Sequence, residues 1–193
     1  MEVVCFDIEA RGKSASRHGI LAVGLVHRNA KGEEVLRKVW NVAPLPGQRY
    51  EDRCLEDFWS KFPDTQRKLE QNPMDPQQFA EEFRTLLNTF DESNVFLLCD
   101  NPSFDAAFIN YYLDYFGLDS MSHDSAGRYA RVVHDADSYT RGFLRSAPGT
   151  NNWVSNAQVA KELGFEILPS VHHMPDEDAA AILDFHLKLQ SKK

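Results

Sequence analysis

The stretch from Val3 to Ala10 limits the possible folds of this chain more than any other. It is apolar and rich in β-branched residues, which is typical of a buried strand. Near its carboxyl end it carries two acids, Asp7 and Glu9. Successive side chains of a strand point to opposite faces of a sheet, so the two acids share one face while Phe6 and Ile8 pack on the other. We therefore expect a core strand that presents two carboxylates side by side.

Two adjacent carboxylates in a core strand are unfavourable, because they repel each other and lose hydration. A cation between them offsets that cost, and Mg²⁺ and Mn²⁺ prefer oxygen ligands of this kind. The alternative is a strand end at which both acids are hydrated, and for an isolated Asp-x-Glu pair this alternative is the commoner one. Further acids brought to the same place by the fold would favour the cation.

The composition fits one globular domain. The chain has 193 residues, of which 42% are hydrophobic and 26% are charged, so we expect residues 1–193 to form a single packed domain. The longest apolar run, Ile20 to Val26, is too short to cross a bilayer, and the short polar start before the first strand argues against a secretory signal. The three cysteines form no C-x-x-C pair. We expect an intracellular protein, cytoplasmic or nuclear, that does not bind membranes.

The formal net charge of −8 argues against a long nucleic-acid interface, because proteins that grip many phosphates are usually basic. Two readings remain. The chain binds no nucleic acid, or it holds a short piece and metal ions supply the positive charge.

Periodicity and turn residues predict alternating strands and helices. Five strands are predicted, at residues 3–10, 20–27, 33–42, 95–99 and 132–134. Helices are predicted over 55–71 with a break at Pro63, over 76–90 and 106–116, from about 138, from 155, and over 175–189. The first three strands should form an antiparallel meander. This order favours one α/β domain, a mixed sheet flanked by helices.

Asp105 is the first candidate to join the acidic pair. It follows the strand at 95–99 and opens the next helix, where the carboxyl ends of strands collect ligand sites. If that strand lies beside the first one, Asp105 faces Asp7 and Glu9. The alternative is an ordinary acid that the helix dipole stabilises.

His173 and Asp178 are the other two candidates. Pro175 begins the last helix, so Asp178 lies about one turn inside it and His173 lies on the preceding loop. A loop histidine can reach over a cleft that a helical acid lines from the side. The alternative for His173 is a surface residue of a polar loop.

Taken together, these residues resemble the three motifs of the DEDDh (DnaQ-like) 3′→5′ exonucleases. The first motif is Phe6-Asp7-Ile8-Glu9, the second is Asn101-x-x-Phe104-Asp105, and the third is His173 with Asp178. The resemblance implies an RNase H-like fold with a mixed five-stranded sheet, three antiparallel strands and then two parallel ones. Two departures concern the terminal nucleotide: Ala10-Arg11-Gly12 replaces Thr-Gly, and Asp100 stands where relatives often have histidine.

The resemblance also implies the chemistry. Two Mg²⁺ or Mn²⁺ ions would be bound by the four acids, with Asp7 bridging the ions, Glu9 and Asp178 completing one site, and Asp105 acting on the other through water. His173 would be the general base. The implied reaction is hydrolysis at the 3′ end of single-stranded DNA or RNA, which releases 5′-mononucleotides.

Substrate contacts are harder to assign. We expect Ala10, Asn101 and Phe104 to contact the terminal nucleotide. Weaker candidates are aromatic residues that could stack on bases and basic residues of the first loop that could meet phosphates: Tyr139, Trp153, Arg11, Lys13 and Arg17.

Three other functions compete with a freestanding exonuclease. One is a non-catalytic RNase H-like module that binds proteins, another is a proofreading subunit with a polymerase partner, and the third is an endonuclease of related fold. The first is disfavoured because the chain keeps all five residues that catalysis would need: Asp7, Glu9, Asp105, His173 and Asp178. The histidine motif argues against the third. DNA or RNA preference and a homodimeric state stay open.

Overall fold

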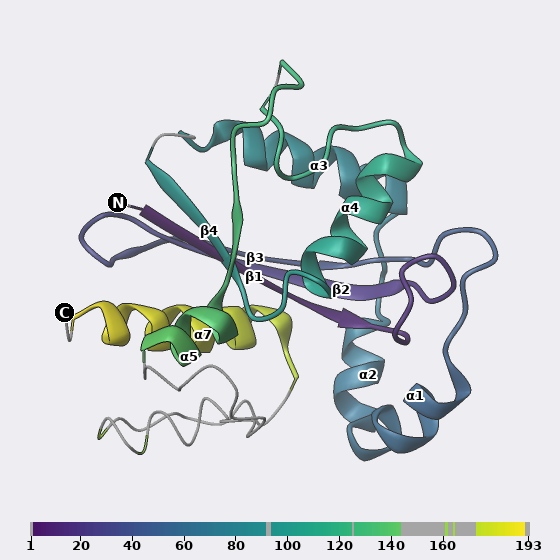
Figure 1. Ribbon diagram of the computed structural model, residues 1–193. Helices are drawn as coiled ribbons and strands as arrows, with labels where there is room; N and C mark the ends of the chain where they lie inside the picture. Colours follow the sequence, from purple (N-terminus) through teal and green to yellow (C-terminus); the bar gives the residue numbers. More distant parts are fainter. Residues whose placement is uncertain are drawn as a thin grey trace.

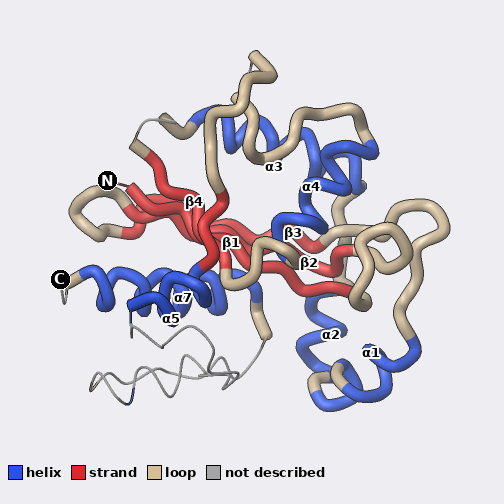
Figure 2. The backbone as a smooth tube through the Cα atoms, in the orientation of Figure 1, coloured by secondary structure: helices blue, strands red, loops and turns tan. Residues whose placement is uncertain are grey.

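The computed structural model describes residues 2–91, 94–124, 126–143, 161, 164 and 173–191. Its centre is a five-stranded sheet with the strand order β3-β2-β1-β4-β5 (Figures 1 and 2). The strands are β1 (Glu2–Ala10), β2 (Ile20–Arg28), β3 (Glu34–Asn41), β4 (Val95–Cys99) and β5 (Val133–Asp135). β1, β2 and β3 are antiparallel, whereas β4 runs parallel to β1 and β5 parallel to β4. The predicted mixed sheet is confirmed, and so is the pairing of the first and fourth strands.

Helices cover both faces of the sheet. In Figure 1, α3 and α4 lie on one face, and α5 and α7 lie on the other. Their bounds are α1 (Asp52–Asp57), α2 (Pro63–Leu69), α3 (Pro76–Thr89), α4 (Asp105–Tyr115), α5 (Ala136–Phe143) and α7 (Pro175–Gln190), with a 3₁₀ turn, η1 (Trp59–Lys61), between α1 and α2. None of the described helices is both long and apolar enough to cross a membrane.

Alternation along β1 divides the core into two parts. Val4, Phe6 and Ile8 pack with α3 and α4 in the larger cluster. Val3 and Cys5 face the other way and pack with Ala179 and Leu183 of α7. Asp7 and Glu9 continue this second row of side chains, so both acids face the side of the sheet that α7 covers.

Some element boundaries differ from the prediction. The helix expected over 55–71 is three short pieces, because Pro63 lacks a backbone N–H and therefore begins α2 instead of interrupting a longer helix. The helix expected from about 138 begins at Ala136, and Asp135 bonds the backbone N–H of Ser138 at 2.6 Å. The predicted helix from 155 lies outside the described residues.

Candidate active site

The carboxyl end of β1 holds the first two acids of the site. Glu9 is buried, with 7% of its surface exposed, and Asp7 is largely buried. Asp7 is paired across the sheet with Gly24 of β2. The pairing register shifts between Glu9 and Ala10, which marks the end of the regular strand. The hydrated strand end is therefore the wrong alternative for Glu9.

Asp105 reaches the same region from the turn that follows the carboxyl end of β4. It is the first residue of α4 and is 4% exposed. The backbone N–H of Asn101 donates to its carboxylate at 3.1 Å, while the Asn101 side chain accepts a bond from the backbone N–H of Ser103 at 3.2 Å. Burial raises the pKa of Asp105 to about 6, although bonds from the backbone of Asn101 and Ile8 act in the opposite direction. Asn101 thus holds the acid through its backbone, and its side chain closes the turn.

Gly24 allows the start of α7 to lie directly on the sheet. A Cβ atom at this position would be 2.1 Å from the backbone nitrogen of Asp176 and 2.1 Å from the carbonyl carbon of Pro175. Any side chain would therefore push the first turn of α7 away from β2. Since Gly24 pairs with Asp7, this close approach brings the turn that carries Asp178 over the acids of β1.

Arg37 of β3 attaches the same turn from the edge of the sheet. Its guanidinium donates to the backbone carbonyl and to the carboxylate of Asp176, both at 3.3 Å. It also bonds Glu34 at 2.8 Å. The N-terminus of α7 is thus fixed both by backbone packing and by a charged side chain.

His173 lies on the loop immediately before α7. Its Nδ1 atom is 3.8 Å from Oε1 of Glu9. One donor atom from each of Glu9, His173 and Asp178 lies within 4.8 Å of the other two. The structure therefore brings together the loop histidine, the helical acid and an acid of the first strand, as predicted from their spacing.

The electrostatics of this cluster favour a bound cation. Burial, followed by the charges of Asp178 and Asp105, raises the pKa of Glu9 to about 9. Burial and the charges of Asp105, Glu9 and Asp178 raise the pKa of Asp7 as well, and Asp100 adds to the effect. Asp100, which the sequence analysis noted only as a replacement for histidine, is thus a fifth acid of the region.

The donor set fits a divalent ion. Opposite ligands of an octahedral Mg²⁺ are about 4.2 Å apart, because each Mg–O bond is about 2.1 Å. Adjacent ligands of such an ion are about 3.0 Å apart, so the carboxylate oxygens of Glu9 and Asp178, which lie within 4.8 Å of each other, would move closer together to bind one ion. Carboxylates whose mutual repulsion raises their pKa gain most when a cation neutralises them.

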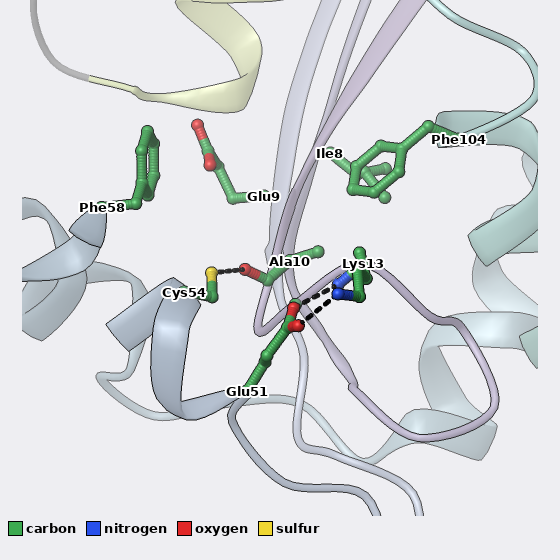
Figure 3. Close-up of a pocket in the computed structure, with 9 residues that line it drawn as sticks. Ile8, Glu9, Ala10, Lys13, Glu51, Cys54, Phe58 and Phe104 are labelled. Carbon is green, nitrogen blue, oxygen red and sulfur yellow. Dashed lines mark hydrogen bonds and ion pairs between the residues drawn. The ribbon is translucent and has the colours of Figure 1, made fainter. Parts of the chain in front are cut away.

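A pocket of about 310 Å³ opens beside Glu9. Phe58 and Phe104 lie on opposite sides of it, and the ion pair of Lys13 with Glu51 crosses its end away from the Glu9 carboxylate (Figure 3). The lining residues are Ile8, Glu9, Ala10, Gly12, Lys13, Glu51, Cys54, Phe58 and Phe104. Ala10 and Phe104, two of the three expected substrate contacts, therefore line this pocket.

The sequence analysis did not identify Phe58, Cys54 or Glu51 as site residues. Helical spacing marks Phe58 only as an apolar residue, and its position beside β1 depends on a tertiary contact. Trp59 makes that contact, because its indole N–H donates to the Ala10 carbonyl at 3.2 Å.

The weaker candidates have other positions. Arg11 is 5% exposed and bonds the backbone carbonyls of Ile20 and Val42, so it supports the fold and cannot meet phosphate there. Lys13 is exposed and lines the pocket, and Arg17 is exposed on the same loop. Tyr139 packs against His186 in the second half of α7, whereas Trp153 lies outside the described residues.

No protein-family model and no curated protein matches this sequence. Solved structures of exonuclease I are similar in fold. A product-bound exonuclease I aligns with 99% of this chain and 44% of its own length, at a TM-score of 0.69 and 12% identity. Exonuclease I of E. coli in complex with a dT13 oligonucleotide aligns with 100% of this chain and 41% of its own, at a TM-score of 0.68 and 14% identity.

A complex described as ExoI/SSB-Ct gives a TM-score of 0.64 at 14% identity. This chain spans less than half of the length of these proteins. At such low identity, the likeness establishes the fold alone. The five-stranded mixed sheet and its helices have the RNase H-like fold of exonuclease I.

Proposed function

We propose that this protein is a divalent-metal-dependent 3′→5′ exonuclease of the DEDDh type, which hydrolyses single-stranded DNA or RNA and releases 5′-mononucleotides. One observation carries the proposal: Glu9, at the end of β1, and His173 and Asp178, around the start of α7, converge beside a pocket with aromatic walls. The shared fold with exonuclease I, one structure of which holds a dT13 oligonucleotide, supports the same function.

Four acids would bind the metal ions. Glu9 and Asp178 lie within one ligand group, and Asp7 and Asp105 lie close enough for their charges to interact. Two Mg²⁺ or Mn²⁺ ions bound there would lower the pKa of a water molecule and offset the negative charge of the phosphate. In this proposal Asp7 and Asp105 would help to hold the ions together with Glu9 and Asp178.

His173 would accept the proton of the attacking water. Imidazole titrates near neutral pH, which suits a group that must take up and release a proton in each cycle. Two observations support this role: Nδ1 of His173 is 3.8 Å from Oε1 of Glu9, and the imidazole contacts Phe58, which lines the pocket. A general base requires this kind of placement within reach of the reacting atoms.

The pocket would hold the terminal nucleotide. Phe58 and Phe104 offer faces on which a base can stack, an interaction that tolerates any base sequence. The Lys13–Glu51 pair crosses the far end of the pocket, so a strand that continued past the last nucleotide would meet it. This favours cleavage from an end over internal cleavage.

The test is hydrolysis of matched 5′-labelled DNA and RNA oligonucleotides in Mg²⁺. Each sequence is prepared with a free 3′ hydroxyl and with a bulky group on the 3′ hydroxyl. We expect the free strands to shorten one nucleotide at a time and the blocked strands to stay intact. Efficient internal cutting of the blocked strands would show that the enzyme is an endonuclease. Absence of hydrolysis on all four substrates would favour the non-catalytic module.

A further inference from the structure

The backbone of His173 has an unusual conformation. Its φ angle is 49°, in the left-handed region that residues with a Cβ atom rarely adopt. Such a conformation persists where the surrounding structure fixes it, and it is often found at functional sites. The neighbouring residue Met174 is buried and anchors the chain just after His173.

Two phenylalanine rings flank the His173 imidazole. The ring centroids of Phe58 and Phe62 lie 4.8 and 4.3 Å from it, at interplanar angles of 70° and 69°. Both are edge-to-face contacts of the kind that aromatic pairs prefer. The 3.8 Å between Nδ1 and Glu9 exceeds a hydrogen bond, so that pair does not fix the plane of the imidazole. We call Phe58 and Phe62 the aromatic cleft.

The aromatic cleft is attached to the strand that carries the acids. Trp59, next to Phe58, is fully buried and bonds the Ala10 carbonyl, one residue after Glu9. Trp59 also packs with Met174 in one apolar cluster, with Phe58 and Phe62 at its edge. The rings, the histidine loop and the end of β1 therefore form one packed unit.

The two rings differ in one respect. Phe58 lines the pocket as well as contacting the imidazole, whereas Phe62 contacts the imidazole and does not line the pocket. Phe104 lines the pocket on the other side, and its ring packs on Phe108 instead of on the imidazole.

We propose that Phe58 and Phe62 are positioning residues that hold the His173 imidazole at the metal group, and that Phe58 also forms the nucleotide pocket. This inference rests on the proposed exonuclease function. Phe62 then affects turnover alone, Phe104 affects substrate binding, and Phe58 affects both. Among the residues that the structure describes, packing rather than a hydrogen bond would keep the imidazole in its working orientation.

Steady-state kinetics on a single-stranded oligonucleotide separate these roles. Phe62→Leu should lower kcat by ~10- to 100-fold with little change in KM, since a misplacement of about 1 Å can cost 10²-fold. Phe104→Leu should mainly raise KM, and Phe58→Leu should change both constants. Phe62→Tyr, which keeps the ring, should recover most of the lost turnover.

Phe90→Leu is the matched control. Phe90 is buried and makes an edge contact with His27 at 5.1 Å. His27 pairs with Val4, toward the opposite end of β1 from Glu9. Its replacement should lower the melting temperature but leave kcat and KM unchanged. A similar loss of kcat in Phe90→Leu and Phe62→Leu would show that general destabilisation, and not the aromatic cleft, explains the effect.

Proton NMR of the imidazole gives a second readout that does not depend on activity. The His173 resonances are assigned by their loss in His173→Ala, with Mg²⁺ present. The ring currents of Phe58 and Phe62 should change the chemical shifts of the imidazole protons. Phe58→Leu and Phe62→Leu should therefore each alter these shifts, whereas Phe104→Leu and Phe90→Leu should not.

The two readouts keep this inference separate from the proposed function. If the wild-type protein hydrolyses no strand, the exonuclease proposal fails, while the resonances still show whether the cleft holds His173. Unmoved resonances in Phe62→Leu, or wild-type turnover by that variant, would overturn the positioning role.

Discussion

At the scale of single residues, the site consists of acids that the fold forces together. Glu9 is buried beside Asp178 and Asp105, and its pKa is raised to about 9. A pair two residues apart on one strand face was readable from the sequence. The approach of residues 173–178 to Glu9 could be predicted only from the motif pattern. No local rule specifies which distant segments of a chain become neighbours in the fold.

The burial of Arg11 was not readable from the sequence. It lies in a polar loop, where a basic residue is ordinarily exposed. Its guanidinium instead donates hydrogen bonds to the buried backbone carbonyls of Ile20 and Val42. Buried carbonyls need such partners. The roles of Phe58 and Phe62 were equally hidden, since an apolar residue at helical spacing is normally part of a core.

Glu9→Gln should stabilise the metal-free protein while abolishing hydrolysis. Glutamine keeps the shape of the side chain but does not ionise, so folding at pH 8 no longer requires the protonation that burial and the charges of Asp178 and Asp105 impose on Glu9. We expect the free energy of unfolding in EDTA at pH 8 to rise by about 1 kcal/mol or more, the equivalent of one pKa unit. Urea denaturation measures it. A Glu9→Gln protein that unfolds more readily than wild type would identify Glu9 as a structural residue.

The metal-free protein should lose stability as the pH rises from about 5 to about 8. The folded-state pKa of Glu9, about 9, and that of Asp105, about 6, both exceed the values of about 4 of the unfolded chain. A raised pKa contributes stability below the unfolded value, which is lost as pH approaches the folded value. Urea denaturation in EDTA across this range should show the decline, and it should be smaller in Glu9→Gln. A pH-independent stability would contradict the raised pKa values.

At the scale of elements, the start of α7 is the part on which the site depends most. The sequence predicted its first residue, because proline is favoured at the first position of a helix and Asp176 and Glu177 suit its first turn. It could not predict that Gly24, inside the apolar strand β2, leaves room for this turn. Glycine inside a strand often marks such a close backbone approach.

Gly24→Ala should displace the first turn of α7 and impair the site. Its Cβ would lie 2.1 Å from the Asp176 nitrogen, so the helix must move, at a cost of about 1–3 kcal/mol. We expect weaker metal-dependent stabilisation and lower turnover than wild type. Gly142→Ala is the control, because nothing lies within 4 Å of a Cβ there and the position is helical. Equal behaviour of the two variants would contradict the role of the close approach.

At the scale of the whole molecule, the charge distribution suits a short substrate contact. The net charge is −8, and Lys13, the basic residue that lines the pocket, is paired with Glu51 at 2.9 Å. The fold class was predictable because three consecutive strands, followed by two strands that are separated by helical patterns, leave few arrangements. The charge alone could not separate a protein that avoids nucleic acid from one that holds only an end.

Binding of a single-stranded oligonucleotide should therefore depend weakly on salt. Each phosphate contact on a single strand contributes about −0.7 to the slope of log K against log salt, so one to three contacts give a slope of about −2 or shallower. Fluorescence anisotropy with the Asp178→Asn variant measures binding without hydrolysis. A slope as steep as about −5 would indicate a long basic track that the described residues do not provide.

The comparison of Asp178→Asn with Asp184→Asn tests the central claim most directly. Both acids lie on α7, but Asp178 belongs to the ligand group and Asp184 pairs with Arg28 at 2.5 Å. Release of 5′-mononucleotides from one oligonucleotide is measured in Mg²⁺ and in EDTA. We expect wild type and Asp184→Asn to be active in Mg²⁺ alone, and Asp178→Asn to be inactive in both. Activity of Asp178→Asn, or wild-type activity that survives EDTA, would contradict a metal-dependent site built from these acids.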